Sequence, residues 1–509
     1  MKRNKETKKD LSRRDFIKTT AVGVGATALA GLGSAEVKTI PPDQVPKWDY
    51  EADVVDVGYG AAGAAAAIAA HDLGAEVLIL EKMPLPGGNT ALTVGPGFVA
   101  GGTSYQREAG VTDSPDAFYQ WLITASRETV DPEVTRAYVE RAPDTLEWLR
   151  ELGFGVSAPT SPPSRLPWVQ DYTPRSHNIT PSGGAAFFKK LDAVVKARGI
   201  KILLETKGVA LVASVQGEVI GLKAESEGKE LYVKARKGVV LADGGFAGKK
   251  EMLKAYCFEG YEAVLRGHPG CTGDGIRMAQ MLGADLINME YIMSGVLVRK
   301  YAPNKFITLS GLEPCIYVDR RGSRFVDEAT AHYYRGYMIW RMAEDTAFMV
   351  FDEETKRMGF SGRLSSDLRK EIEDGVVLQA STIGELATKI GVNPAKLEDT
   401  VNSYNLDCET GIDPKFGKPE RYLKPLKTPP FYAIEITGGM GTTQGGVRIN
   451  GKSQVKNTFG DVIPRLYAAG RAAGGHMAPL YILSGYGAAS ALVSGRIAGE
   501  NAAAETPWL

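Results

Sequence analysis

A glycine-rich segment near residue 60 has the residue types and the spacing to bind a diphosphate. It reads GYGAAG over residues 58–63. In such a pattern Gly58 allows a tight turn, Gly60 lets a diphosphate approach the backbone, and Gly63 lets a helix pack closely on a strand. The first N–H groups of that helix, and the positive end of its dipole, then face the anion. The segment therefore predicts a dinucleotide-binding turn.

The flanking sequence supplies the elements that this turn needs. Residues 53–57 (DVVDV) are typical of a short buried strand, an alanine-rich helix follows to about Leu73, and residues 75–80 (AEVLIL) are typical of a second strand. Glu81 ends the second strand about 20 residues after the glycines, where an acidic residue accepts hydrogen bonds from ribose hydroxyls. A strand–helix turn that binds no ligand is the alternative, because the glycine motif by itself is weak evidence.

Asp56 is unusual within the first of these strands, where an apolar residue is expected. Two environments fit a carboxylate at this position. It lies at an exposed pleat of the strand, or it is buried and needs a partner, because a buried charge without one is costly.

The residues after Glu81 favour FAD over NAD as the dinucleotide. They are Glu81-Lys82-Met83-Pro84, followed by Gly87-Gly88-Asn89-Thr90. With these segments the chain resembles the flavoprotein superfamily that contains fumarate reductase, succinate dehydrogenase and 3-ketosteroid dehydrogenase. Further matching segments, in the order of that superfamily, are residues 181–185 (PSGGA), 238–246 (GVVLADGGF), 272–275 (TGDG) and 463–470 (IPRLYAAG).

The resemblance implies an α/β fold in which a capping domain interrupts a Rossmann-type FAD-binding domain, with the active site between them. We expect the FAD-binding domain over residues 50–289 and 429–505 and an α+β capping (substrate) domain over 290–428. The capping segment has fewer glycines and more aromatic residues than its flanks, and an amphipathic helical stretch over 381–404. The residues expected to contact FAD are Gly58, Gly60, Ala61, Ala62, Gly63, Glu81, Lys82, Gly87, Gly88, Asn89, Thr90, Gly183, Gly184, Asp243, Gly244, Gly245, Asp274, Gly470 and Arg471.

Two of these residues depart from the usual sequence of the superfamily. Asp243 stands where Thr or Ala is more common, and Arg471 stands where fumarate reductases usually have Glu. Both changes affect expected flavin contacts, and a cation at residue 471 is expected to shift the flavin potential. The FAD is expected to be non-covalent, because no His precedes Thr90-Ala91-Leu92-Thr93, the stretch after Asn89.

The substrate side lacks the cationic groups that a fumarate reductase uses. The proton-donating Arg of that branch is absent near residues 310–312, the carboxylate-binding His is absent from residues 442–446, and an Arg is absent from residues 481–485. A buried dicarboxylate without positive partners costs several kcal/mol. These absences therefore argue against fumarate reduction.

The residues at the last of these positions resemble those of 3-ketosteroid dehydrogenases. Tyr481 and Gly485 match a Tyr-x-x-x-Gly motif whose phenol and backbone N–H bind a ketone oxygen, which is an oxyanion-hole arrangement. The resemblance also implies two acid–base groups, the first at Tyr172 and the second a few residues after the turn at 325–328. The register of the second leaves three candidates, which are His332, Tyr333 and Tyr334.

Each of these residues also has a structural interpretation. A Tyr in an aromatic stretch usually packs with its hydroxyl at the surface, and His332 and His476 are more often structural histidines than acids. Arg165, Arg175 and His177 are candidates for binding an anionic group of the substrate.

The overall composition excludes several classes of protein. The 509 residues contain 60 Lys and Arg against 60 Asp and Glu, so the net charge gives no electrostatic case for nucleic-acid binding. Four cysteines, scattered along the chain, have neither metal-ligand nor haem-attachment spacing, so no metal is expected. The 59 glycines exceed the average of about 7% and indicate close approach of backbone to a ligand.

The N-terminal 35 residues are typical of an export signal. A basic segment, residues 1–18, precedes a small and apolar one, residues 19–35. The Ser12–Lys18 stretch, SRRDFIK, resembles the twin-arginine signal. The alternative is a disordered basic tail before a buried helix. Export by the twin-arginine translocase carries folded chains, so a non-covalent cofactor stays bound, and the expected destination is the periplasm.

Three hypotheses follow for the function. The first is dehydrogenation or reduction of a C–C bond beside a ketone, with electrons exchanged with a separate partner such as a periplasmic cytochrome or a quinone-linked protein. The second is a respiratory reductase of another activated alkene, such as an aryl acrylate, held by Arg165, Arg175 or Arg335. The third is an electron-transfer subunit with no substrate of its own.

Overall fold

The computed structural model describes residues 39–508, apart from 94–96, 162–165, 170, 259, 262, 302–313, 359–366, 478 and 480. These residues belong to one compact unit, Lys38–Leu509. The expected export signal, the candidate Arg165 and the segment 310–312 lie outside the described residues.

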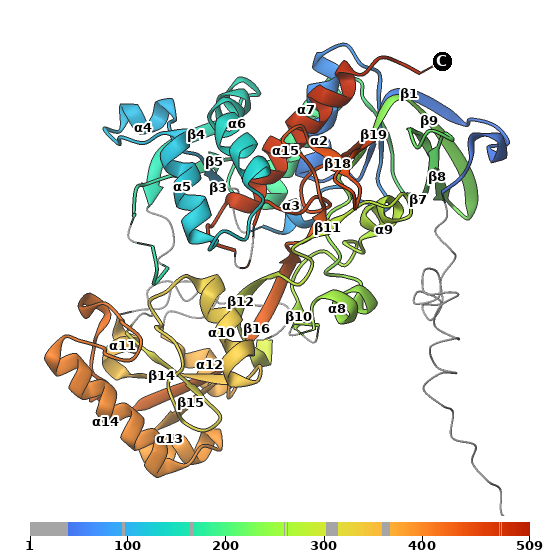
Figure 1. The fold of residues 1–509 in the computed structure, drawn as a ribbon. Coiled ribbons are helices and arrows are strands. Elements are labelled where there is room, and N and C mark those ends of the chain that lie inside the picture. The colour runs from blue at the N-terminus through green and yellow to red at the C-terminus, as the bar shows by residue number, and fades with distance from the viewer. Residues whose placement is uncertain are drawn as a thin grey trace, which may run out of the picture. The chain divides into compact units, whose positions relative to one another are not determined.

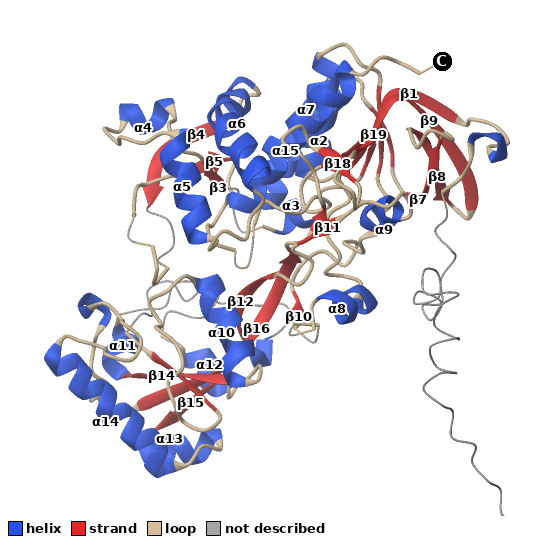
Figure 2. Cartoon of the chain, viewed as in Figure 1, coloured by secondary structure: helices blue, strands red, loops and turns tan. Residues whose placement is uncertain are grey.

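An eight-stranded sheet forms the core of the expected FAD-binding domain (Figures 1 and 2). Its strand order is β18-β19-β9-β1-β2-β6, and β7 and β8 extend it as an antiparallel pair beside β9. The strands from β19 to β6 are parallel, as in a Rossmann-type sheet. Their bounds are β1 Tyr50–Val57, β2 Val77–Leu80, β6 Lys201–Leu203, β7 Thr206–Ala213, β8 Val219–Ser226, β9 Lys229–Leu241, β18 Gln454–Lys456 and β19 Val462–Ala468. The α/β fold expected from the sequence is confirmed.

Two helices of small residues pack on each other beside this sheet. They are α2 (Ala61–Asp72) and α15 (Tyr486–Ala504), which lie side by side in Figure 1. A Cβ on Gly495 would lie 2.3 Å from the carbonyl oxygen of Ala62, and one on Gly499 would lie 2.2 Å from that of Ala66. These glycines therefore let two backbones meet, so part of the glycine excess serves helix packing rather than cofactor contact.

Asp56 is fully buried in the centre of this sheet. It is paired with Ile79 on β2 and with Val240 on β9. Neither of its carboxylate oxygens has a hydrogen-bond partner among the described residues. Burial raises the pKa of the Asp56 carboxyl well above its ordinary value. The buried alternative is thus the one the structure shows, with the carboxyl held neutral.

Replacing Asp56 by Val is expected to raise the free energy of unfolding at neutral pH by about 1–3 kcal/mol, because an unpartnered polar group is removed from the core. The folded pKa lies above the unfolded one, so the wild type loses stability as pH rises, and the gain is larger at pH 8 than at pH 5. Urea denaturation at both pH values measures this difference.

Asp53, in the same strand, is the matched control. It accepts a hydrogen bond from Arg236 Nε at 2.8 Å, so Asp53→Val is expected to destabilise the protein. An Asp56→Val protein less stable than the wild type at pH 8 would show that Asp56 has a stabilising partner.

A second sheet carries the expected capping segment. Its order is β10-β16-β14-β13, and β12 and β15 also pair with β16. The bounds are β10 Val264–Leu265, β12 Ile292–Val298, β13 Ile316–Asp319, β14 Ala347–Asp352, β15 Val377–Ala380 and β16 Phe431–Thr443. Figure 1 shows β16 as a long strand of this sheet, and it ends at Thr443. The chain therefore rejoins the first sheet, at β18 and β19, only after Thr443, whereas the expected boundary is at 428. The domain limits themselves stay a prediction.

The amphipathic stretch at 381–404 forms two helices rather than one. They are α13 (Ile383–Ile390) and α14 (Pro394–Thr410). Gly391 ends the first helix with a φ of +73°, and the Asn393 side chain accepts a hydrogen bond from the Lys396 N–H at the start of the second. A glycine stop followed by an Asn-Pro start is a recognisable helix boundary that the apolar periodicity concealed.

The remaining elements surround the two sheets. A three-stranded sheet contains β3 Gly97–Val99, β4 Gly155–Ser161 and β5 Ser176–Thr180, and a two-stranded one contains β11 Leu286–Ile287 and β17 Gly446–Val447. The other α-helices are α3 Gly88–Leu92, α4 Ser104–Glu108, α5 Pro115–Ala125, α6 Pro132–Glu151, α7 Gly184–Ala197, α8 Lys250–Tyr256, α9 Asp274–Gln280, α10 His332–Ala343, α11 Glu353–Arg357 and α12 Arg369–Glu373.

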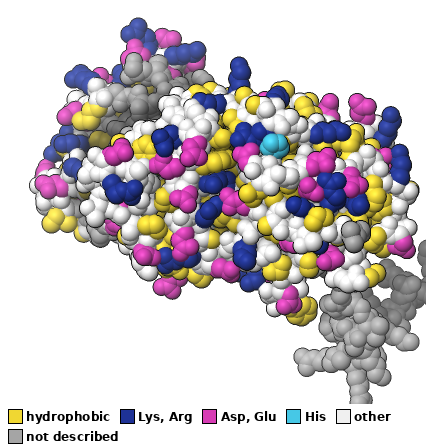
Figure 3. All heavy atoms as spheres, turned by 90° about the horizontal axis from the view of Figure 1, so that it is seen from above, with side chains coloured by type: hydrophobic (Ala, Val, Ile, Leu, Met, Phe, Trp, Pro, Cys, Tyr) yellow, Lys and Arg dark blue, Asp and Glu magenta, His cyan; other side chains and the backbone are white. Residues whose placement is uncertain are grey.

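The short 3₁₀ helices are η1 Pro42–Gln44, η2 Arg299–Tyr301 and η3 Glu420–Tyr422. None of the helices in the described part of the chain is long and apolar enough to cross a membrane. On the face that Figure 3 shows, acidic and basic side chains are mixed, in keeping with equal numbers of the two in the sequence.

Candidate active site

One cavity of about 580 Å³ lies at the carboxyl ends of the parallel strands. Val57, Leu80 and Ala242, which end or directly follow β1, β2 and β9, line it. The N-termini of α2 and α15 also line it, so two positive helix ends face the same space. A ligand bound there would occupy the position typical of open α/β sheets.

Most residues expected to contact FAD line this cavity. They are Gly58, Gly60, Ala61, Ala62, Glu81, Lys82, Gly88, Asn89, Thr90, Asp243, Gly244, Asp274, Gly470 and Arg471. Five others of the expected set do not line it, namely Gly63, Gly87, Gly183, Gly184 and Gly245.

Three of these five glycines pack closely against other parts of the chain. A Cβ on Gly63 would lie 2.0 Å from the Gly58 carbonyl oxygen, and one on Gly184 would lie 2.2 Å from that of Thr90. A Cβ on Gly245 would lie 2.2 Å from Thr443 Oγ1. These three glycines therefore allow close packing of the chain around the cavity, and their contact with FAD stays a prediction.

Among the glycines that line the cavity, Gly58 turns the chain, whereas Gly60 and Gly88 have open space beside them. Gly58 has a φ of +105°, which turns the chain between β1 and α2. A Cβ on Gly60 would meet nothing closer than 3.7 Å, and one on Gly88 would meet nothing within 4 Å. Both glycines thus leave room in a cavity lined by backbone, which fits the close approach of a large dinucleotide such as FAD.

Charged side chains near this backbone hold one another in place. Glu81 accepts hydrogen bonds from the N–H groups of Tyr59 and Met83, each at 2.8 Å. Lys82 Nζ donates to Asp274 Oδ2 at 2.6 Å, and Lys207 lies 3.1 Å from Asp274 Oδ1. The remaining lone pairs of Glu81 suit ribose hydroxyls, and the lysines suit a diphosphate.

Asp243 adds a third carboxylate to this end of the cavity, beside Glu81 and Asp274. It accepts a hydrogen bond from the Gly275 N–H at 2.8 Å through Oδ2, while Oδ1 is buried with no hydrogen-bond partner among the described residues. Burial and the neighbouring Asp274 raise the pKa of Asp243 to about 6, against the effects of the Gly275 N–H and Lys82.

Replacing Asp243 by Asn is expected to change how the stability of the FAD-free protein depends on pH. Because the folded pKa of about 6 lies above the ordinary value of 3.8, Asp243 favours folding below pH 4, and this benefit is lost as pH rises through 6. Relative to the wild type, the variant gains roughly 2–3 kcal/mol between pH 4 and pH 7. Chemical denaturation at several pH values checks this, with Asp274→Asn as the control of opposite sign, because the pKa of Asp274 is lowered. Parallel pH profiles of wild type and Asp243→Asn would contradict the expectation.

The other end of the cavity is aromatic. His332, Tyr333, Tyr481, Ser484 and Gly485 line it, although α10 and the segment before α15 lie about 150 residues apart in the sequence. The ring centroids of Tyr333 and Tyr481 are 4.5 Å apart, and those of His332 and Tyr333 are 5.6 Å apart. The structure thus brings together four of the five residues expected to be catalytic.

The Tyr481 hydroxyl is anchored at the start of α15. It accepts a hydrogen bond from the Gly487 N–H at 2.9 Å. Gly485 is the N-cap of α15 with a φ of +87°, and a Cβ there would lie 2.8 Å from the carbonyl carbon of Gly97. The backbone therefore needs glycine at 485 both for its conformation and for its contact with β3.

A buried ion cluster fixes the turn that leads into α10. Glu328 accepts a hydrogen bond from Arg324 Nη2 at 3.0 Å and from Lys418 Nζ at 3.1 Å, and another from the Tyr317 N–H at 3.0 Å. This cluster ties the expected turn at 325–328 to β13. The following residues then start α10 with His332 and Tyr333 at the cavity.

The protonation states of the aromatic end differ. Burial lowers the pKa of His332 well below its ordinary value, and the charges of Arg335 and Arg266 add to this effect, so the imidazole is neutral. Burial and the neighbouring Tyr481 raise the pKa of Tyr333. Burial also raises the pKa of Tyr481, but Arg471 and the N–H groups of Gly487 and Gly485 oppose the rise.

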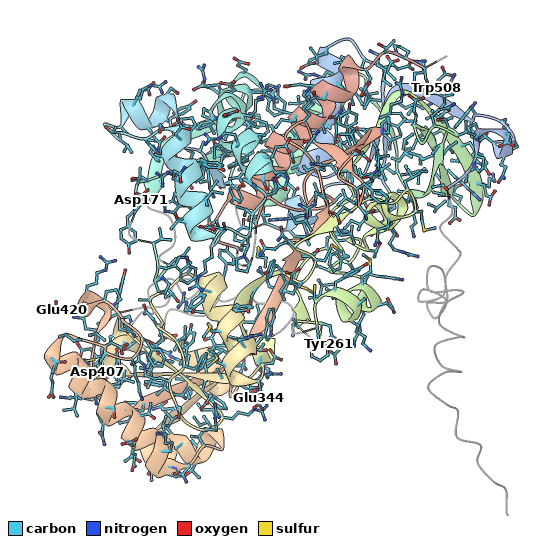
Figure 4. All side chains as sticks on the ribbon, in the orientation of Figure 1. Asp171, Tyr261, Glu344, Asp407, Glu420 and Trp508 are labelled. Carbon is cyan, nitrogen blue, oxygen red and sulfur yellow. The ribbon has the colours of Figure 1, made fainter. Side chains whose placement is uncertain are left out.

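Tyr172 and Tyr334 do not line the cavity. Tyr172 is 41% exposed, and its neighbour Asp171 lies at the edge of the part that contains α5 (Figure 4). Tyr334 is half-buried and packs edge-on against Trp168, with ring centroids 5.7 Å apart. Of the three residues left open at 332–334, the first two face the cavity.

The cations proposed as substrate clamps are engaged elsewhere. Arg175 is buried and makes a bidentate pair with Asp113 at 2.8 and 2.9 Å. His177 lies 3.0 Å from the Ser157 carbonyl oxygen through Nδ1. Arg335 donates to the Glu328 carbonyl oxygen at 2.9 Å. None of these three lines the cavity.

Several cavity residues were missed by the sequence reasoning. They are Arg266, His268, Lys207, Met293 and Ser484. Arg266 directly follows β10, and His268 donates its N–H to Asn89 Oδ1 at 2.5 Å. For Arg266 and His268 the one available signal was their place just before the TGDG segment at 272–275.

Comparison with known proteins agrees with this geometry. Residues 53–487 match the family model described as an FAD binding domain, and residues 10–30 match the signal sequence of the twin-arginine translocation pathway. The chain thus carries an export signal of this type.

Among curated relatives, the chain is 34% identical to an NADH:fumarate oxidoreductase of Klebsiella pneumoniae over 89% of its own length. It spans 47%, about half, of the length of that relative. It is 31% identical to a urocanate reductase of Eggerthella lenta, covering 95% of this chain and 80% of that protein.

Among solved structures, a 3-ketosteroid-Δ4-(5α)-dehydrogenase of Rhodococcus jostii RHA1, in complex with 4-androstene-3,17-dione, superposes with a TM-score of 0.78. The two chains are 30% identical, and the match covers 92% of this chain and 100% of the other.

Proposed function

The chain belongs to the FAD binding domain family of flavoprotein oxidoreductases, and from that premise we propose that it dehydrogenates or reduces a C–C bond adjacent to a ketone. The observation that carries this proposal is the grouping of Tyr481, Gly485 and Tyr333 at one end of the cavity that fits FAD. A phenol and a backbone N–H are suited to a ketone oxygen that becomes an enolate.

The roles of the residues follow from their positions. Gly58, Gly60 and Lys82 would hold the diphosphate of a non-covalent FAD, and Glu81 its ribose. FAD, when bound, supplies hydride exchange with the substrate carbon β to the ketone. Tyr481 and Gly485 bind the ketone oxygen, and Tyr333 is placed to exchange the α-proton.

The wider setting follows from the export signal. We place the enzyme in the periplasm, where a cytochrome or a quinone-linked protein supplies or takes the electrons. This partner is a separate protein in our proposal.

A second function is favoured by one observation. Arg266 and Arg471 line the cavity, and the charge of Arg266 adds to the lowering of the His332 pKa and opposes the rise in the Tyr333 pKa. A substrate carboxylate would match such a cation, and urocanate, an aryl acrylate, is the substrate named for the Eggerthella lenta relative. Reduction of an aryl acrylate is therefore the alternative.

An anaerobic half-reaction screen separates the two functions. Flavin absorbance of the dithionite-reduced holoenzyme is followed after addition of 4-androstene-3,17-dione, 2-cyclohexenone or urocanate, and that of the oxidised holoenzyme after a saturated 3-ketosteroid. Reoxidation by an enone, or bleaching by the saturated ketone, supports the first proposal. Reoxidation by urocanate alone, lost in Arg266→Met, supports the second, and an inert flavin contradicts both.

A further inference from the structure

We propose that Arg471 is a positioning residue, which together with the N-terminus of α15 holds the Tyr481 hydroxyl toward the substrate and stabilises the negative charge that develops there. This inference rests on the proposed function and assigns which group supplies the charge that the oxyanion site needs. It concerns Arg471, a residue otherwise expected only to contact the flavin.

The two side chains meet at one point of the backbone. A Cβ on Gly487 would lie 2.9 Å from Arg471 Nη2 and 3.0 Å from the Tyr481 hydroxyl. The Gly487 N–H donates to the same hydroxyl at 2.9 Å, and the Arg471 guanidinium carbon lies 5.9 Å from the Tyr481 ring centroid. Because it has no Cβ, Gly487 thus leaves room for both the guanidinium and the phenol oxygen at the start of α15.

Arg471 is a cation in need of an anion. Within the described residues, its guanidinium makes one side-chain hydrogen bond, to Met477 Sδ at 3.9 Å, and has no carboxylate partner. Burial lowers the pKa of Arg471, and the neighbouring Tyr481 and Tyr486 oppose this effect. A cation kept inside a protein without a partner is costly, so a charge that forms during the reaction is a fitting counterpart.

The other titratable groups around Arg471 do not fill this role. Burial, and then the charge of Arg471, lowers the pKa of His476 to about 3, so this imidazole is neutral. Burial raises the pKa of Tyr486, which does not line the cavity. Tyr481 is therefore the neighbour of Arg471 that both faces the cavity and can carry a negative charge.

The electron and proton balance of the step is simple. In the reductive direction a hydride, which brings two electrons, bonds to the β-carbon of the enone, and the C=C π electrons shift so that the carbonyl oxygen becomes an enolate. The Tyr481 O–H bond breaks as its proton moves onto that oxygen, which leaves an enol and a phenolate stabilised by Arg471 and the Gly487 N–H. The enol O–H then returns this proton to Tyr481 while the α-carbon takes a proton from Tyr333, and Tyr333 takes up a proton from solvent, so the saturated ketone is released. Dehydrogenation is the reverse, with the α-proton moving to Tyr333 and the hydride leaving the β-carbon.

The test compares Arg471→Gln and Arg471→Lys in the holoenzyme. The ultraviolet tyrosinate band is titrated without substrate in each protein and in its Tyr481→Phe counterpart, and the difference isolates Tyr481. We expect Arg471→Gln to move this titration up by about one pH unit or more and to lower turnover of 4-androstene-3,17-dione about 10–100-fold. Arg471→Lys is expected to restore part of the Tyr481 titration and part of the turnover. Its kcat–pH profile is expected to lie between those of the wild type and Arg471→Gln.

Arg496→Gln is the matched control. Arg496 lies on α15 and is partly buried, but it pairs with Glu500 and does not line the cavity. We expect the Tyr481 titration to be unchanged in this variant. The titration needs no substrate, so it tests Arg471 even if the ketone proposal fails.

A Tyr481 titration that does not move in Arg471→Gln would overturn the inference. A shifted flavin midpoint potential in the same variant would then mean that the guanidinium acts on the flavin instead. If the titration moves as expected and neither ketone nor enone reacts, the proposed function fails and the role of Arg471 toward Tyr481 stands.

Discussion

Replacing Gly60 by Val is expected to abolish FAD binding while the protein still folds. Gly60 lines the cavity, its φ is −98°, and a Cβ there meets no protein atom closer than 3.7 Å. The larger side chain therefore fits the folded chain and occupies the space that the diphosphate needs. We expect a colourless protein with an FAD affinity lowered at least about 100-fold, since a diphosphate excluded from this turn loses several kcal/mol of contacts.

Fluorescence titration with FAD measures the loss, and circular dichroism with thermal denaturation checks the fold. Gly63→Val is the informative comparison, because a Cβ at 63 would lie 2.0 Å from the Gly58 carbonyl oxygen. That variant is expected to lose stability as well as FAD. A Gly60→Val protein that remains yellow after gel filtration would contradict the site.

Replacing Tyr481 by Phe is expected to lower kcat about 10²–10³-fold, which is the usual effect of removing one oxyanion-hole donor. FAD content is expected to be unchanged. The ring still packs on Tyr333, at a centroid distance of 4.5 Å in the wild type, so the change removes the hydroxyl and little else. Single-turnover reoxidation of the reduced holoenzyme by 4-androstene-3,17-dione measures the effect on the chemical step.

Two other tyrosines serve as controls for Tyr481. Tyr334→Phe and Tyr172→Phe remove hydroxyls that lie outside the cavity, and each is expected to change kcat less than about twofold, as surface and packing changes usually do. Equal losses in all three variants would point to a general effect on the fold. Wild-type turnover in Tyr481→Phe would remove Tyr481 from the mechanism.

The dinucleotide end of the cavity was predictable because its information is local. A turn at Gly58, an open backbone at Gly60 and an acidic residue ending the next strand are set by short-range geometry within a strand–helix–strand unit. The glycines at 63, 184 and 245 were assigned to FAD by the same motifs. In the structure Gly63 and Gly184 lie against backbone atoms and Gly245 lies against the Thr443 side chain, because a motif records the need for glycine and not which atom approaches it.

The aromatic end was less predictable because it depends on how separate elements meet. Successive residues of a helix point about 100° apart, so which of residues 332–334 face the cavity depends on how α10 packs. The position of α10 follows from the Glu328 cluster, whose partner Lys418 is 90 residues away in the sequence. Tyr172 shows the same limit, since its place before a glycine-rich segment did not bring it to the cavity.

The partners of the charged side chains could likewise not be predicted from the sequence. The sequence made Arg175 and Arg335 candidates for binding an anionic substrate. In the structure Arg175 donates to Asp113 and Arg335 donates to the Glu328 carbonyl oxygen. Arg266, absent from the expected set, lines the cavity because β10 pairs with β16 of the second sheet. A side chain's chemistry can be read from its type, but its availability depends on residues that only folding brings near.

By itself the sequence determined the fold class, the dinucleotide turn, the FAD family and the export signal, because each is encoded in contiguous residues. Only the tertiary structure decided that His332 and Tyr333 share a cavity with Tyr481. It also decided that Asp56 is buried with no hydrogen-bond partner among the described residues, and that Arg471 and the Tyr481 hydroxyl both lie against Gly487. These are contacts between elements, and their distances are set by packing of the whole core rather than by any local pattern.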